Sequence, residues 1–149
     1  MIILLSKFEF SIKFKIDSKI MFKNIIDFEY YPNFMKQIQN VKIIKKSENE
    51  IITEETIVLK SLIKKEIVQQ TIHQIKENKI HSEIISGIAK NSIIDIILDE
   101  SEEETTVNVK IELKLGFKGI IFEPLIKKYL KMYVIGILRK INTKILEKS

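Results

Sequence analysis

Polar and apolar residues alternate strictly over residues 8–16, FEFSIKFKI. The Phe and Ile side chains fall on one face, and the Glu, Ser and Lys side chains fall on the other. This period of two is that of a β-strand, so the stretch predicts a strand with one buried face. Asp17 and Ser18 follow, and either side chain can accept a hydrogen bond from a free backbone N–H at the start of a helix. We therefore expect a helix to begin there.

Helical spacing replaces the alternation after Ser18. The apolar residues that recur with this spacing are Ile20, Met21, Ile25 and Phe28. Pro32 then interrupts the pattern, because its ring disfavours a helical conformation in the residue before it. We predict one short helix before Pro32 and a second short helix after it, from about Asn33 to Gln39.

From Val41 to Leu115 the pattern predicts six strands in a meander. Polar segments typical of turns separate them, at Ser47–Glu50, Leu62–Lys65, Glu77–Lys79, Gly87–Asn91 and Asp99–Glu104. The last strand, Thr106–Leu115, alternates as regularly as the first. Asp95, inside the apolar strand SIIDIIL, is expected on the convex, solvated face; a buried acid with a raised pKa is the alternative.

The period becomes helical again after Gly116 and Gly119. Pro124 fits the first turn of a helix, where its missing N–H is not needed. An apolar stripe runs along this helix through Phe122, Ile126, Tyr129, Tyr133 and Ile137. Ile135 and Leu138 lie outside the stripe, so they need cover of their own from a dimer contact, a lipid surface or the end of a cavity.

Together these elements predict an α+β fold. It has a seven-stranded curved antiparallel sheet, two short helices after the first strand, and a long C-terminal helix across the concave face. Such a sheet buries one face, and a single long helix is enough to cover it. The chain has 149 residues, 45% of them hydrophobic, which suits one domain over residues 1–149.

The composition excludes several kinds of chemistry. There is no cysteine, so disulfides, thiol nucleophiles and thiolate metal sites are excluded. No Gly-rich phosphate loop, paired-His metal motif or nucleophile elbow occurs. The apolar run Met1–Leu5 is too short for a signal peptide, and no stretch approaches the ~20 apolar residues of a membrane span. We therefore expect a cytoplasmic protein with no cofactor and no bound metal.

Positive charge is concentrated towards the C-terminal end. The net charge is +5, and the segment from Lys118 onwards holds seven Lys and one Arg against two Glu. A solvated helix face explains this basic stripe. A surface that makes peripheral contact with an anionic membrane, a ribosome or an acidic partner explains it as well. We predict no binding to DNA, and either a monomer or a dimer.

The elbow, residues 25–34 with the sequence IIDFEYYPNF, links the first helix to the first strand of the meander. Its Asp27, Tyr31, Pro32 and Phe34, together with the element order, resemble the helix-grip superfamily of START, Bet v 1 and polyketide cyclase domains. The closest likeness is to the coenzyme Q-binding and polyketide cyclase/dehydrase-like branch. The resemblance implies a cavity between the sheet and the last helix. It also implies that Tyr31 and Phe34 close the cavity mouth; plugging one end of the core is the alternative.

The two histidines flank one predicted hairpin turn. A two-residue loop, Glu77-Asn78, would pair Lys76 with Lys79, His73 with Ser82, and Gln74 with His81. His73 and His81 then point to opposite faces of the sheet and cannot share a metal. The face with His73 also holds Gln69, Thr71 and Ser82 among isoleucines, and we take this face as concave.

A row of polar groups in an apolar setting is typical of a pocket that orients the carbonyl or hydroxyl group of a ligand. The residues predicted to contact a ligand are Tyr31, Phe34, Gln69, Thr71, His73, Ser82, Ile84, Ile111, Leu113, Tyr129 and Tyr133. His73 is the only catalytic candidate.

Three function classes follow from these features. The first is a carrier that binds a small hydrophobic molecule such as a lipid, isoprenoid, quinone or polyketide-like compound. The second is a cyclase, dehydratase or hydrolase acting on such a molecule, with His73 as acid or base. The third is docking on a ribosome or acidic partner through the basic helix, which steep salt dependence would reveal.

Overall fold

The computed structural model describes residues 4–58, 66–116, 120–121 and 123–148. Seven strands and three helices are defined in this part of the chain: β1 (Leu4–Phe14), α1 (Ser18–Ile25), the 3-10 helix η1 (Phe28–Asn33), β2 (Ile38–Lys46), β3 (Glu50–Val58), β4 (Glu66–Ile75), β5 (Lys79–Ile84), β6 (Ile93–Ser101), β7 (Glu104–Leu115) and α3 (Glu123–Glu147). The predicted turn at Leu62–Lys65 and the stripe residue Phe122 lie outside the described residues.

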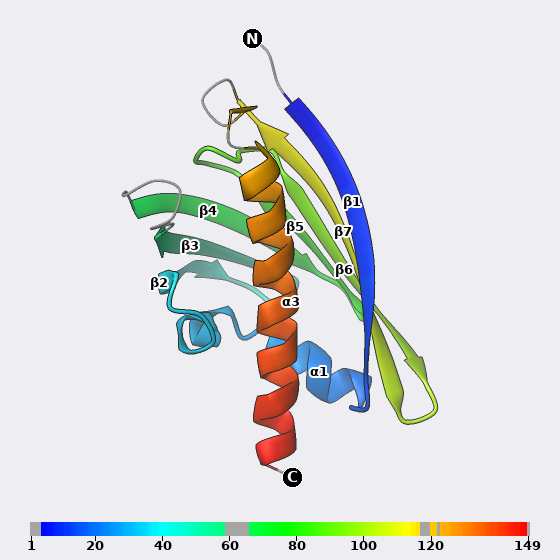
Figure 1. The fold of residues 1–149 in the computed structure, drawn as a ribbon. Coiled ribbons are helices and arrows are strands. Elements are labelled where there is room, and N and C mark those ends of the chain that lie inside the picture. Colours follow the sequence, from blue (N-terminus) through cyan, green and yellow to red (C-terminus); the bar gives the residue numbers. More distant parts are fainter. Residues whose placement is uncertain (1–3, 59–65, 117–119, 122, 149) are drawn as a thin grey trace.

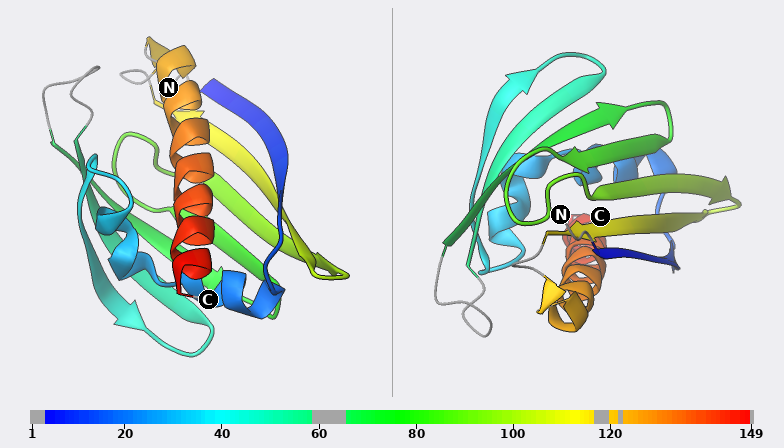
Figure 2. Two further views of the ribbon diagram at one scale, coloured as in Figure 1. Left: turned by 60° about the horizontal axis from the view of Figure 1, so that its bottom comes forward. Right: turned by 90° about the horizontal axis from the view of Figure 1, so that it is seen from above.

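The strands form one antiparallel sheet in the order β1-β7-β6-β5-β4-β3-β2. The sheet curves, and α3 runs across its concave face (Figures 1 and 2). Two shifts of register between β2 and β3 help to bend that edge, because a bulge kinks the strand that carries it. The predicted α+β fold, with its seven-stranded curved sheet and long C-terminal helix, is confirmed.

The strand registers follow the polar–apolar alternation. In β7 every second side chain is buried, at Thr105, Val107, Val109, Ile111, Leu113 and Leu115. The β4–β5 hairpin has the predicted register, with His73 opposite Ser82 and Gln74 opposite His81. The first strand begins at Leu4 and ends at Phe14, so it lies earlier than the predicted residues 8–16. Ile16 is still buried beyond the end of the strand.

Asp17, one of the two residues predicted to cap the first helix, caps α1. Its Oδ1 accepts a hydrogen bond of 2.7 Å from the Lys19 N–H. The helix ends at Ile25, before Pro32 is reached, and Asp27 has left the helical conformation with φ −82° and ψ 65°. Pro32 is therefore not what ends the helix.

The predicted second helix, from Asn33 to Gln39, is wrong. The chain forms η1 over Phe28–Asn33, with Pro32 inside it, and β2 already begins at Ile38. The short helix tolerates proline because its bonds lie on either side of it, from Tyr30 N to the Asp27 carbonyl (3.1 Å) and from Phe34 N to the Tyr31 carbonyl (2.9 Å). A single 3-10 turn loses little when one N–H is missing.

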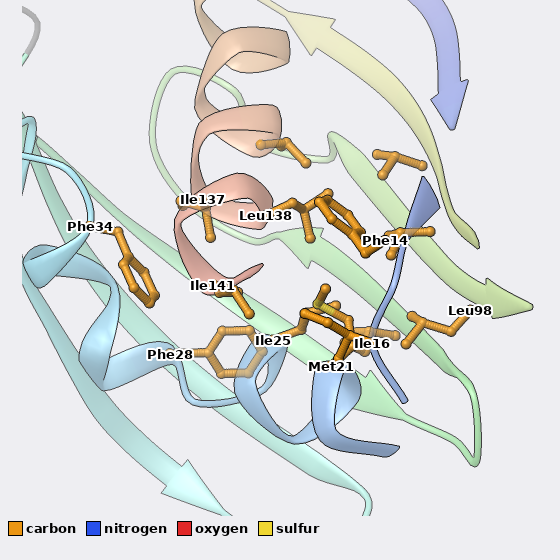
Figure 3. Packing of buried hydrophobic residues seen from close by; sticks show 14 of the residues in the cluster. Phe14, Ile16, Met21, Ile25, Phe28, Phe34, Leu98, Ile137, Leu138 and Ile141 are labelled. Carbon is orange, nitrogen blue, oxygen red and sulfur yellow. The ribbon is translucent and has the colours of Figure 1, made fainter. Parts of the chain in front are cut away.

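The elbow connects the two edges of the sheet. β1 and β2 are consecutive strands, yet they lie at opposite edges of the sheet. α1 and η1 carry the chain from one edge to the other beneath the C-terminal half of α3 (Figure 2). Figure 3 shows the resulting core, in which the labelled side chains include Met21, Ile25, Phe28, Phe34, Ile137, Leu138 and Ile141.

The buried stripe of α3 changes position along the helix. Pro124 is the second residue of α3 and so lies in its first turn, as predicted. Towards the C-terminal end the buried residues are Val134, Ile137, Leu138 and Ile141. Leu138 is thus buried in the core of its own chain, where it is 2% exposed. Its burial therefore needs neither a dimer contact nor a lipid surface. Among the described helices, none is long and apolar enough to span a membrane.

Candidate ligand cavity

A cavity of about 180 Å³ lies between the concave face of the sheet, the elbow and α3. Its walls are mostly aliphatic and aromatic, with a few polar side chains among them. Apolar cavities of about 150 Å³ already accept guests the size of benzene. The space is therefore large enough for a small apolar molecule or for one segment of a longer one.

Most of the predicted contact residues reach this cavity. The sheet contributes Gln69, Thr71, His73, Ser82, Ile84 and Leu113, and the elbow and α3 contribute Tyr31, Tyr129 and Tyr133. Phe34 and Ile111 are not part of the lining but belong to the core, 6% and 1% exposed respectively. Phe34 packs against Tyr30 and Tyr31 inside the elbow, so it plugs the core, which was the alternative interpretation. Ligand contact by the lining residues stays a prediction.

Most of the lining residues that were not predicted are apolar, but one, Glu55, carries a charge. It lies on β3, 8% exposed, with its Oε1 accepting a hydrogen bond from Thr53 Oγ1 (2.5 Å) and its Oε2 accepting one from Thr71 Oγ1 (3.2 Å). Burial raises the pKa of the Glu55 carboxyl to about 7, although the two hydroxyls favour the ionised form. A signal existed in the sequence: in ITEETI, alternation forces one of two adjacent glutamates to face inwards.

His73 is fully engaged by the protein. Its Nδ1 lies 2.7 Å from Ser82 Oγ, its Nε2 lies 2.9 Å from Thr53 Oγ1, and its ring stacks on Phe28 at 3.9 Å. Thr53 gives its single hydroxyl proton to Glu55, so it accepts from the Nε2–H, and Nδ1 accepts from Ser82. Burial lowers the pKa of His73 to about 3. Its 4.0 Å contact with Glu55 is therefore not an ion pair, since the imidazole is neutral.

Three phenols border the same space. The Tyr31 hydroxyl donates a 2.5 Å hydrogen bond to the Ile25 carbonyl, the last of α1. The Tyr129 hydroxyl is buried and has no hydrogen-bond partner within the described part of the chain. Burial raises the pKa of Tyr133, with Tyr31, Glu55 and Tyr129 close enough to add to the effect. A neutral phenol can donate or accept, so, among the contacts that the structure describes, Tyr129 has a hydrogen bond left for a ligand.

Replacing Tyr31 with Phe should lower the free energy of unfolding by about 1–2 kcal/mol, because the Ile25 carbonyl loses its partner in a partly buried position. Urea denaturation measures this. Tyr30→Phe is the matched control, since Tyr30 is 37% exposed, and it should have little effect. Equal losses in the two variants would contradict a special role for the Tyr31 bond.

His81 lies on the other face of the sheet, as predicted. Its Nδ1 is 2.5 Å from Oδ1 of Asp95, which stands opposite it on β6. Asp95 is half-buried by this contact and lies outside the cavity lining, which agrees with a convex position. Across the described residues, no three His, Asp or Glu side chains are grouped closely enough to hold a metal ion.

The curved sheet, the long helix across it and the cavity between them define a helix-grip fold. The family of polyketide cyclase/dehydrase and lipid transport proteins matches residues 18–134, and the chain belongs to this family. No curated protein sequence matches the chain.

Solved structures share the fold at low sequence identity. TTHA0849 from Thermus thermophilus has 13% identity and a TM-score of 0.82, covering 97% of this chain and 99% of its own. The Zhui aromatase/cyclase from Streptomyces sp. R1128 has 6% identity and a TM-score of 0.81, with 95% and 93% covered. A START superfamily protein from Mycobacterium smegmatis has 12% identity and a TM-score of 0.74, with 92% and 97% covered.

Proposed function

We propose that this protein binds and carries a small hydrophobic molecule in the cavity between its sheet and α3. The observation that carries the proposal is the cavity itself, with apolar walls and few polar side chains. A lipid, an isoprenoid, a quinone or a polyketide-like compound fits this chemistry. Membership of a family that includes lipid transport proteins supports it.

The polar side chains support a ligand with at least one oxygen or nitrogen. The buried Tyr129 hydroxyl has no partner in the described structure, and Glu55 can still accept a hydrogen bond besides those from Thr53, Thr71 and its own backbone N–H. A buried hydroxyl without a partner loses free energy that a ligand atom can restore. Gln69, at the same wall, offers an amide for the same purpose.

Filling the cavity should weaken ligand binding. Ala89 is 8% exposed and borders the cavity beside Ile84 and Leu113, so Ala89→Phe places a ring where the ligand would lie. We expect Nile red, a neutral apolar dye, to bind the wild type and to bind this variant at least about tenfold more weakly. Lys90→Phe adds the same ring at an exposed neighbour and should bind as the wild type does. Equal binding by both variants would place the dye elsewhere and refute the proposal.

A second candidate function is an acid–base reaction on such a ligand, as in a cyclase, dehydratase or hydrolase. The observation that favours it is Glu55, a cavity carboxyl whose pKa of about 7 suits proton transfer at neutral pH. Glu55 is a better candidate than His73, because both nitrogens of His73 already bond to the protein. Turnover of a polyketide-like substrate that Glu55→Gln abolishes, with binding retained, would favour the enzyme over the carrier.

The basic helix gives little support to docking. Four of its lysines turn back onto their own chain: Lys127 lies over Phe8, Lys131 over Phe10 and Lys144 over Tyr30, while Lys140 donates to the Phe34 carbonyl. Contact with an anionic membrane or a ribosome stays a prediction, as does the oligomeric state. The single continuous sheet supports treating residues 1–149 as one domain.

A further inference from the structure

We propose that the cavity selects an apolar amine, binding its ammonium group at Glu55, over neutral and anionic molecules with the same apolar chain. This inference rests on the proposed function, because it names the class of hydrophobic ligand that the same cavity takes.

The described lining of the cavity carries one acidic side chain and no basic one. Among the described residues of the lining, Glu55 is the only Asp, Glu, Lys or Arg. His73 is neutral at physiological pH, since burial lowers its pKa to about 3. A carboxylate or phosphate head group would therefore meet one acid and no cation among the described lining residues. Burying an unpaired charge is strongly unfavourable, so the site disfavours anionic ligands.

Three lysines of α3 make contacts outside the described lining. Lys127 and Lys131 are on the cavity-facing helix α3, but their ammonium groups lie 5.4 Å from the ring of Phe8 and 6.0 Å from the ring of Phe10. Lys140 bonds to the Phe34 carbonyl, at the elbow. These contacts hold the three ammonium groups outside the described lining, in which no Lys or Arg occurs.

Glu55 can accept further hydrogen bonds. Thr53 Oγ1 occupies one site on Oε1, and Thr71 Oγ1 occupies one on Oε2. The backbone N–H of Glu55 itself also bonds to the carboxylate. The two oxygens have about four lone-pair directions between them, so at least one remains for an ammonium group. The titratable groups that face Glu55 are the neutral imidazole of His73 and the phenols of Tyr31 and Tyr133, from β4, η1 and α3. Its neighbour Glu54 interacts with Gln70 on the other side of β3. None of these groups supplies a positive charge.

Aromatic side chains add a second attraction for a cation. Phe28, Tyr31, Tyr129 and Tyr133 all contribute to the same lining. The faces of aromatic rings carry partial negative charge and attract ammonium groups, and the attraction increases when the site is desolvated. A carboxylate among aromatic rings is the combination expected for an amine, whereas a fatty acid would need a cation in the same place.

The effect should follow the ionisation of Glu55. Only the carboxylate form pairs with an ammonium, and the pKa of Glu55 is about 7, so amine binding should strengthen from pH 5.5 to 8.5. An alkylamine stays protonated over this range, because its pKa is near ~10 as for a lysine side chain. Binding of a neutral alcohol should change little over the same range.

The test compares dodecylamine, dodecanol and dodecanoate, which share a twelve-carbon chain and differ in charge. The chain has four tyrosines and no tryptophan, and three of those tyrosines line the cavity, so tyrosine fluorescence reports binding directly. All three probes are titrated below their micelle concentrations, with isothermal calorimetry as the second readout. At pH 8 we expect dodecylamine to bind about 10- to 100-fold more tightly than dodecanol, as a charge-assisted hydrogen bond allows. Dodecanoate should bind most weakly.

Two variants test whether Glu55 causes the preference for dodecylamine. In Glu55→Gln, the preference for dodecylamine over dodecanol should fall to less than about threefold. Glu54→Gln removes the adjacent carboxylate, which lies away from the cavity, and should leave the preference unchanged. Circular dichroism checks that both variants are folded.

The outcomes separate this inference from the proposed function. If dodecanol binds and dodecylamine binds no more tightly, or if dodecanoate binds most tightly, the amine inference is overturned while the hydrophobic carrier stands. If the preference survives in Glu55→Gln, the ammonium lies elsewhere and the inference is wrong. If none of the three probes and no Nile red binds to folded protein, the proposed function itself fails.

Discussion

Glu55→Gln should stabilise the protein at pH 8, by about 1–3 kcal/mol in the free energy of unfolding. Burial raises the pKa of Glu55 to about 7, whereas in the unfolded chain it returns to an ordinary value near 4.5. The folded state therefore binds this proton more tightly than the unfolded state does. The contribution of Glu55 to stability is greatest below pH 4.5, falls as the pH rises from 4.5 to 7, and stays low above that.

Gln keeps the shape of the protonated acid and cannot ionise, so the variant should lose this dependence. Urea denaturation at pH 4.5, 6 and 8 measures the difference between variant and wild type, which should grow with pH. Glu54→Gln is the matched control and should give a small difference at every pH, because Glu54 is not in the cavity. A variant that is equally destabilised at pH 4.5 and pH 8 would mean that the carboxylate is well solvated or paired.

Ile141→Ala should destabilise the protein by about 2–5 kcal/mol, the range for a large aliphatic side chain removed from a packed core. Ile141 is 0% exposed and belongs to the main core cluster, where the C-terminal half of α3 meets α1 and the elbow (Figure 3). It is not part of the cavity lining, so its removal leaves a new void in close-packed surroundings.

Two other positions on α3 show whether packing is the cause. Ile126 borders the existing cavity and is half-buried, so Ile126→Ala should cost about 1 kcal/mol or less. Met132 is 61% exposed, and Met132→Ala should change stability by about 0.5 kcal/mol at most. Thermal and urea unfolding of the three variants give this order. An Ile126 variant as unstable as the Ile141 variant would show that the cavity end of the helix is packed solid.

Strong periodicity made the sheet predictable from the sequence. β7 alternates along its whole length, and a one-residue slip would turn its apolar side chains to solvent. The two-residue loop of the β4–β5 hairpin fixed its register in the same way, and with it the opposite directions of His73 and His81. The elbow was harder to predict, because Pro32 reads as a helix breaker, whereas a 3-10 turn accommodates it.

The polar wall of the cavity was only partly predictable. Gln69, Thr71, His73 and Ser82 lie on strands with clear alternation, so their common face followed from register. Glu55 was missed because an acidic pair within a strand is usually solvated, and its burial depends on hydroxyls supplied by Thr53 and Thr71. Leu138 was placed outside the apolar stripe because a helical wheel assumes that the same face is buried along the whole helix. In α3 the buried residues are those that pack into the core towards its C-terminal end.

The pairing of β1 with β7 has a consequence for how the chain is made. Leu4 pairs with Leu115, so β1 has no partner strand until β7 has been synthesised, after β2 to β6. Contacts between such distant residues slow folding, because a long loop must close before they form. Until then the phenylalanine-rich face of β1 is open to other chains and to chaperones. The cavity becomes complete only when α3, which follows β7 in the chain, packs onto the sheet.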